Sequence, residues 1–385
     1  MAFKLCCELI KRNGRKISIE SLLKIAAIGT VADVAPLVGE NRTIAWLGLQ
    51  GLADPRNPGL RALMRRLGLL GRALRAVDIG FKIGPRINAA GRLSSAETAI
   101  DLFAAASEET AWELCAELDR MNSERQEIER AVREEAEEQV LSPESCALSA
   151  AAPQDSGLRT QDSIPRVIIL AGEGWHKGVI GLTAGRVAQK YHRPTLVISI
   201  DGDHCAGSAR SIPSINLHAQ LETVADLFTH FGGHDYACGF SLETHNLPAL
   251  RERLAAQFAT LDAHLFSREA KVDAALPLAA IDAEFLAAHE MLQPFGAGNP
   301  QPLFLGRDAL VLSARTFAPD CTELVIEDAS GRATAVVWPS AQTLAAQLAP
   351  GARADVLFHV EPDAYAPAGA RLEIVDARPR TRSTE

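Results

Sequence analysis

The sequence contains no long hydrophobic run and no pair of cysteines in CxxC spacing. No stretch approaches the roughly 18 consecutive apolar residues that a membrane-spanning helix needs, and Lys4, Glu8 and Lys11 interrupt the first apolar residues, so no signal peptide is expected. None of the seven cysteines forms a CxxC pair, which argues against a zinc ribbon or a dithiol redox centre. We therefore expect a cytoplasmic protein, away from membranes, whose thiols stay reduced.

Acidic residues are almost missing from one segment of an otherwise acidic chain. The formal net charge is −9, yet the segment from Arg56 to Arg92 holds nine lysines and arginines against a single acid, Asp78. A basic stripe within an acidic protein is typical of a surface that binds a polyanion. The alternative is an ordinary solvated helix face.

The chain is long enough for two or three domains, with 385 residues, 47% hydrophobic and 23% charged. Helical periodicity begins at the first residues without a preceding cap, so we expect the chain to start inside a domain. A long helix is predicted over residues 106–140 and a flexible loop over 141–165. The remaining predicted domains are residues 1–105, 166–262 and 263–378, with a disordered basic tail over 379–385.

Residues 166–259 show an α/β pattern. Strands are predicted at 167–170 and 195–200, with a helix over 179–191 between them. The glycine-rich loop at 172–178 contains His176 and follows the first strand. Ligands commonly bind at this position in open α/β sheets.

The stretch from Gly207 to Gly239 is the strongest candidate for a binding site. Its first part is predicted to be a glycine-led turn in which Ser208, Arg210 and Ser211 form an anion cradle. Its last part is predicted to form a second anion-binding turn of the same kind, from Gly232, Gly233 and His234. The alternative is two ordinary turns that carry a surface arginine and histidine.

Two further segments carry candidate site residues. Residues 83–92 are predicted to be a loop because they contain a proline and two glycines, and this loop presents Arg86, Asn88 and Arg92. Asp33 follows an apolar run, where it is either an active-site carboxylate or a cap.

The C-terminal third is predicted to be β-structure. Apolar runs occur at 303–312, 324–326, 333–338, 354–360 and 372–375. Five short strands fit a small barrel such as an OB-fold, which commonly binds nucleic acids.

Five motifs together resemble one family. They are Ala27–Val34, Gly84–Arg92, Trp175–Gly181, Gly207–Ser211 with Phe231–His234, and Pro294–Pro300. In this order they resemble the RecJ family of bacterial single-strand-specific exonucleases, within the DHH phosphoesterase superfamily. The resemblance implies an α/β architecture with part of a DHH domain, a connecting helix, a DHH-associated domain and an OB-fold.

The resemblance also implies a reaction and a set of roles. The reaction is 5′→3′ hydrolysis of single-stranded DNA in repair and recombination, with manganese or magnesium in a two-metal site. Asp33 matches a metal ligand. Helicases or single-strand-binding proteins are the implied partners, and we expect a monomer. The phosphate- and substrate-binding matches are Arg86, Asn88, Arg92, His176, Ser208, Arg210, Ser211, Gly232, Gly233 and His234.

The sequence also departs from the family pattern. It has no Asp-His-His motif, and Ala209 occupies a position where glycine is expected. Asp33 alone cannot hold two metal ions, because each needs several oxygen or imidazole ligands. Two alternatives therefore stay open: a non-catalytic module that binds single-stranded nucleic acid, and a DHH-type phosphodiesterase acting on oligonucleotides or cyclic dinucleotides.

Overall fold

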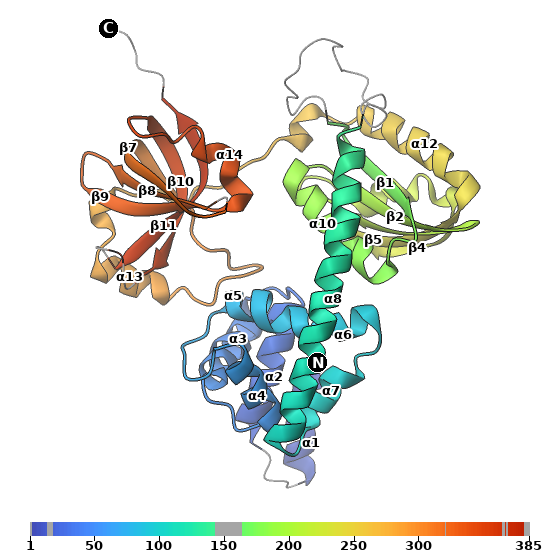
Figure 1. The fold of residues 1–385 in the computed structure, drawn as a ribbon, viewed down its shortest axis with the longest axis horizontal. Coiled ribbons are helices and arrows are strands. Elements are labelled where there is room, and N and C mark those ends of the chain that lie inside the picture. Colours follow the sequence, from blue (N-terminus) through green and yellow to red (C-terminus); the bar gives the residue numbers. More distant parts are fainter. Residues whose placement is uncertain are drawn as a thin grey trace. The chain divides into compact units, whose positions relative to one another are not determined.

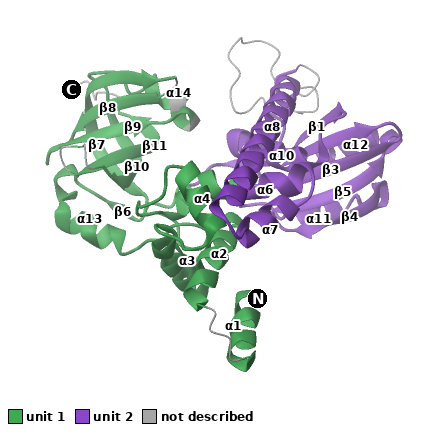
Figure 2. Cartoon of the chain, turned by 60° about the horizontal axis from the view of Figure 1, so that its bottom comes forward, with its two compact units in different colours: residues 1–85, 270–385 green, residues 86–269 purple. Residues whose placement is uncertain are grey.

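The computed structural model describes residues 2–13, 18–142, 164–319, 321–363, 366 and 369–380. The chain, whose helices and strands are labelled in Figure 1, divides into two compact units (Figure 2). Unit 1 comprises residues 1–85 and 270–385, and unit 2 comprises residues 86–269. Among the described residues, no helix is long and apolar enough to cross a membrane.

The first part of unit 1 is helical. Helices α2 and α3 pack closely, with Ala27 and Ile28 of α2 buried. Helix α4 begins with a proline and is capped by the Asn57 side chain, which accepts a hydrogen bond from the Leu60 amide. The elements are α1 Ala2–Asn13, α2 Ile19–Ala32, α3 Gly39–Leu52, α4 Pro58–Arg66, α5 Ala76–Asp78 and the π-helical turn η1 Ile79–Ile83.

The predicted loop over residues 83–92 is wrong. These residues continue from η1 directly into helix α6 (Gly84–Leu93). Pro85 comes directly after the π-helical turn, in which the Gly84 amide donates to the Ile79 carbonyl, and the helix continues through it although the proline nitrogen has no hydrogen to donate to the preceding turn. The π-helical turn before it is a local widening of the kind often found near functional sites.

The second part of unit 1 is a barrel. Strands β7 to β11 follow the five predicted apolar runs, and pairing of β10 with both β11 and β7 closes the barrel. This confirms the predicted C-terminal five-stranded barrel. The elements are β6 Ala274–Ala275, α13 Ala283–Glu290, β7 Phe304–Ala318, β8 Cys321–Glu327, β9 Arg332–Val337, α14 Gln342–Ala345, β10 Arg353–Pro362 and β11 Ala370–Pro379, with short 3₁₀ turns at Leu278–Ala280 and Pro339–Ala341.

The predicted disordered tail begins too early. Strand β11 extends to Pro379, and the Arg380 guanidinium lies 2.9 Å from the Asp355 carboxylate of β10. The ion pair and the strand pairing hold this basic segment against the barrel. Residues 381–385 lie outside the described part of the chain.

Unit 2 contains a five-stranded sheet in the order β1-β2-β3-β5-β4. Strands β1 and β2 are parallel and joined through α10, which confirms the predicted strand–loop–helix–strand segment, while the other pairings are antiparallel. The elements are α7 Glu97–Ala104, α8 Glu108–Val140, β1 Ile168–Glu173, α10 Lys177–Tyr191, β2 Thr195–Asp201, β3 His204–Arg210, α11 Leu217–Glu222, β4 Phe228–His234, β5 Ala237–Glu243 and α12 Leu247–Ala259, with 3₁₀ turns at Ala225–Leu227, Thr244–Asn246 and Ala263–Phe266.

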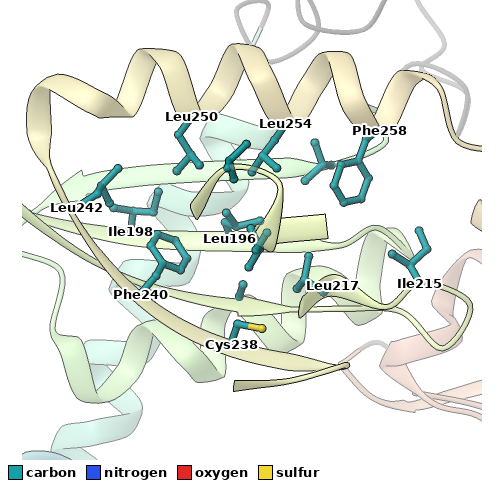
Figure 3. Packing of buried hydrophobic residues seen from close by; sticks show 14 of the residues in the cluster. Leu196, Ile198, Ile215, Leu217, Cys238, Phe240, Leu242, Leu250, Leu254 and Phe258 are labelled. Atoms are coloured by element: carbon teal, nitrogen blue, oxygen red, sulfur yellow. The ribbon is translucent and has the colours of Figure 1, made fainter. Parts of the chain in front are cut away.

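Helix α12 covers one face of this sheet. Leu250, Leu254 and Phe258 point from α12 onto the strands, and Phe240 of β5 belongs to the same buried cluster (Figure 3). Each of these four residues is at most 4% exposed. The burial of such large apolar side chains stabilises the sheet by roughly 1.5–3 kcal/mol each.

Helix α8 packs against helix α10 and against strand β1 of unit 2. It spans Glu108–Val140, within the predicted residues 106–140, and it is capped by Ser107, whose hydroxyl accepts a hydrogen bond from the Thr110 amide. Near its end, the Gln139 side chain donates to the Ala171 carbonyl and accepts from the Ala171 amide. Because Ala171 lies on the edge strand β1, these two bonds cover part of an exposed sheet edge. The predicted loop over 141–165 falls largely on residues 143–163, outside the described part.

Candidate anion-binding site

Ser208 and Arg210 lie side by side on strand β3. Alternation along the strand puts both side chains on the face covered by α10. The Arg210 Nη1 donates to the Ser208 hydroxyl at 2.9 Å and to the Ala209 carbonyl at 2.8 Å. A side chain at Gly181 of α10 would place its Cβ 3.0 Å from both the Arg210 Nη2 and the Ser208 hydroxyl. Gly181 therefore allows the arginine and the serine to lie directly against α10.

The predicted turn at Gly207–Ser211 is a strand instead. Gly207 faces Phe240 on β5, and a Cβ at Gly207 would lie 2.1 Å from the phenyl ring. Gly207 thus makes room for the Phe240 ring on the core side of the sheet. Its missing side chain does not serve to let a ligand approach the backbone. Ser211 lies just beyond the strand, where its hydroxyl donates to the Ile215 carbonyl at 2.6 Å.

The predicted residues Gly232, Gly233 and His234 lie on β4, in the hairpin with β5, and not in a glycine turn. Register aligns Ser208 with Gly239, and Gly239 with Gly232, so two glycines continue the row beside the serine. This leaves a strip of sheet without side chains next to Ser208. Gly233 has φ 151°, and His234 is exposed at the end of β4.

Arg92 and His176 meet at the start of α10. The Arg92 Nη1 donates to the Gly178 carbonyl at 3.2 Å, and the His176 Nδ1 accepts from the Gly178 amide at 3.1 Å. His176 therefore caps α10, which was not predicted. Arg92 comes from α6, so the first turn of α10 is connected to a segment far away in the sequence.

Three residues of this site were not predicted. Arg125 and Glu129 of α8 are 7% and 2% exposed, and the Arg125 Nη1 donates to the Glu129 carboxylate at 2.6 Å. The Arg186 Nε of α10 lies 2.5 Å from the other oxygen of the same carboxylate. The available signal was spacing, because Arg125 and Glu129 interrupt the apolar stripe that contains Leu118 and Val132.

The pKa shifts show that these cations gather in one place. Burial lowers the pKa of the Arg92 guanidinium, Arg125 lowers it further, and Glu129 opposes that effect. Burial also lowers the pKa of Arg210, and its next cause is Arg92. Such shifts arise when like charges are brought together away from water. The Glu129 carboxylate therefore holds Arg125 and Arg186, Arg92 lies close enough to feel both members of the Arg125–Glu129 pair, and Arg210 lies close enough to Arg92 to feel its charge.

Arg86 and Asn88, the other two candidates from residues 83–92, have different surroundings from Arg92. The Arg86 Nε donates to the Asp119 carboxylate of α8 at 2.6 Å, which joins α6 to α8. Asn88 lies on an exposed position of α6. The wider basic segment is also partly neutralised, since Arg75 pairs with Glu290 and Glu361, Lys82 with Asp78, and Arg61 with Asp54.

Asp33 belongs to unit 1, where it ends helix α2. Its backbone amide donates to the Gly29 carbonyl, and its side chain is exposed. The next residue, Val34, has φ 55°, which is strained for a β-branched residue and typical of functional positions. The motif at 294–300 supports this turn, because the Ala297 carbonyl accepts a hydrogen bond from the Leu37 amide at 2.6 Å.

The described residues do not form a complete metal centre. No three histidine, cysteine, aspartate or glutamate side chains in that part of the chain are grouped to hold an ion. Asp33 supplies one carboxylate, whereas manganese and magnesium need several oxygen or nitrogen ligands. The residues present therefore do not by themselves fit a two-metal site.

Known proteins match both the sequence and the fold. The DHHA1 domain family matches residues 165–260, and the RecJ OB domain family matches residues 272–369. Proteins named single-stranded-DNA-specific exonuclease RecJ are 34% identical over 88% of this chain in Bacillus subtilis (strain 168) and 32% identical over 83% in Salmonella typhimurium (strain LT2). The chain belongs to the RecJ family.

A solved structure of RecJ agrees with this assignment. The crystal structure of RecJ in complex with Mn²⁺ from Thermus thermophilus aligns with 97% of this chain and 52% of that chain, at TM-score 0.78 and 28% identity. The predicted α/β fold with a DHH-associated domain and an OB barrel is thus confirmed. The chain spans 41% of the Bacillus RecJ and 54% of the Salmonella RecJ.

Proposed function

We propose that this chain belongs to a metal-dependent, single-stranded-DNA-specific 5′→3′ exonuclease of the RecJ type, acting in DNA repair and recombination, and that residues 1–385 alone are largely inactive. The observation that carries the proposal is the pair of Arg210 and Ser208 packed against Gly181 of α10, with Arg92 bonded to Gly178 at the start of the same helix. A site this rich in guanidinium groups and this poor in acids selects a strongly anionic ligand. RecJ relatives are named for single-stranded DNA, and a 5′-phosphorylated strand ends in such a group.

The cluster is suited to a terminal phosphate. Near neutral pH a terminal phosphate monoester carries up to about one more negative charge than an internal diester. Arg210 and Ser208 supply donors from β3, Arg92 adds positive charge, and the glycine strip leaves space beside them. Binding of the terminal phosphate would fix the polarity of degradation, because only one end of the strand could be held there.

The metal requirement is also a proposal for this chain. RecJ structures are described in complex with Mn²⁺ and with Mg²⁺. Asp33 would supply one oxygen ligand from its strained turn, and a divalent ion would activate water and stabilise developing charge. Asn88, Ser211 and His234 remain predicted substrate contacts. A cytoplasmic monomer that works with a helicase or a single-strand-binding protein also remains a proposal.

The test is the affinity for two kinds of DNA end. Arg210→Ala should weaken binding of 5′-phosphorylated single strands roughly ten- to a hundredfold, because a hydrogen bond to a charged group contributes about 1.5–3 kcal/mol. The affinity for strands with a 5′-hydroxyl should fall much less. Arg56→Ala, at an exposed position of unit 1, is the control and should affect both ends alike.

The same measurement separates the alternatives. Equal losses for both ends in Arg210→Ala would place Arg210 in a general backbone groove and refute the terminal-phosphate site. Tight binding of a cyclic dinucleotide, which has no terminal phosphate, would instead favour the phosphodiesterase with small substrates. Binding that stays selective for the 5′-phosphate in a full-length protein that hydrolyses nothing would favour the non-catalytic module.

A further inference from the structure

A polar groove lies between helices α8 and α10 of unit 2. It has a volume of about 470 Å³ and is lined by Ser123, Gln126, Glu129, Arg130, Arg133 and Arg186, together with Glu127. Most of these residues are on the solvent-facing side of α8, next to the buried row that contains Arg125. None of the residues predicted from the sequence lies in its wall.

The charges in the groove favour an anionic occupant. The Glu129 carboxylate is engaged by two guanidinium groups, from Arg125 at 2.6 Å and Arg186 at 2.5 Å, so it offers little free negative charge. Arg130 and Arg133 have no carboxylate partner within the described part of the chain. Glu127 is the one acid in the wall that is left to oppose them. Serine and glutamine add neutral donors.

The groove shares two structural elements with the terminal-phosphate site. Arg186 follows Gly181 by five residues on α10, an axial rise of about 7.5 Å and a rotation of about 140° around the helix, and Glu129 lines the groove while also acting on the charge of Arg92. The terminal-phosphate site and the groove therefore lie on different faces of the same helix, less than two turns apart along its axis. A backbone with regularly spaced phosphates can use both, whereas a mononucleotide cannot.

We propose that this groove is a second subsite that binds an internal phosphodiester of the same single strand. The proposal rests on the function proposed above. Arg130 and Arg133 are its main cations, and Arg186 is positioned in its wall by Glu129. The subsite reads charge and not base identity, because its wall contains no aromatic side chain on which a base could stack.

The test compares ligands of different length. The double variant Arg130→Gln with Arg133→Gln keeps most of both side-chain stems and removes both charges. Its affinity for a 5′-phosphorylated thymidine decamer should fall about three- to tenfold, whereas that for thymidine 5′-monophosphate should change less than about twofold. The slope of log affinity against log salt should fall by about 0.7 for every phosphate that the variant no longer neutralises.

The matched control removes one charge from each of the two helices outside the groove. Arg120→Gln with Lys190→Gln does this, and both residues pair with glutamates: Arg120 with Glu117, and Lys190 with Glu137. If the groove variant and this control bind the decamer equally well, the proposal fails. Equal losses for the decamer and the monophosphate would assign the two arginines to the terminal-phosphate site.

Failure of the underlying function gives a different result. If the 5′-hydroxyl decamer binds as well as the phosphorylated one, and Arg210→Ala does not distinguish them, the terminal site is refuted. Loss of decamer binding in the groove variant would then still support a backbone site. A heptaglutamate peptide should bind more weakly than the decamer. If it binds the wild type as tightly as the decamer does, and the groove variant loses this binding, the assignment to nucleic acid is overturned.

Discussion

Removal of the negative charge from Glu129 should strongly destabilise unit 2. The change Glu129→Gln keeps the shape of the side chain but removes the carboxylate on which two arginines converge. Arg125, which is 7% exposed, would then have only neutral acceptors, the new amide oxygen at position 129 and the Asn122 amide oxygen at 3.2 Å. Arg92 would also lose the carboxylate that offsets its repulsion from Arg125.

The magnitude follows from burial. Removal of one partner of a buried ion pair costs about 3–5 kcal/mol, because the remaining charge stays desolvated. The pair with Arg186 adds little, since that side chain is 54% exposed and exposed pairs contribute about 0–1 kcal/mol. We therefore expect a loss of about 3–5 kcal/mol in the free energy of unfolding of this unit. Phosphate should restore part of it, because an anion can replace the missing charge.

The assay is hydrogen exchange in urea, followed by mass spectrometry on peptides from α8 and α10. These peptides report on unit 2 alone. Glu127→Gln is the matched control, because it makes the same change at an exposed position of the same helix and should stay within about 0.5 kcal/mol of wild type. A loss below about 1 kcal/mol for Glu129→Gln, or no recovery with phosphate, would refute the view that Glu129 balances a buried cation cluster.

Two further predictions concern unit 1. Residues 1–385 alone should release few nucleotides from 5′-labelled single-stranded DNA with manganese, because Asp33 brings one ligand where several are needed; manganese-dependent turnover that Asp33→Ala abolishes would contradict this. His289 is 3% exposed, is packed 5.2 Å from the Phe295 ring, and has no hydrogen-bond partner for either ring nitrogen among the described residues. Burial lowers its pKa, opposed by Glu361 and Glu290 and assisted by Arg75 and His359. Its contribution to stability is therefore present above the unfolded value near 6.5 and is lost as pH falls towards the lower folded value, by up to about 1.4 kcal/mol per pH unit. Urea unfolding between pH 7 and pH 5 should depend less on pH in His289→Phe; an unchanged dependence would show that other groups control it.

Local patterns were enough to predict several elements. The strands at 167–170 and 195–200, the helix over 106–140 and the five barrel strands each carry a continuous apolar pattern that specifies its own structure. Glycine was the main source of error. Gly207 lies in a strand because it leaves room for the Phe240 ring, and that requirement is invisible in the local sequence. Pro85 similarly follows a π-helical turn and lies within a helix, although the proline and glycines of residues 83–92 predict a loop.

The sequence by itself determined the family and the position of one binding motif, because Ser208 and Arg210 are two residues apart and share one face of a strand wherever that strand lies. Only the tertiary structure decided which cations join them. Arg92, Arg125 and Arg186 come from three helices that are distant in the chain, and they meet through the packing of α6, α8 and α10. The single carboxylate of Glu129 balances them because burial makes an unpaired charge costly, and no local pattern specifies which charge will be buried.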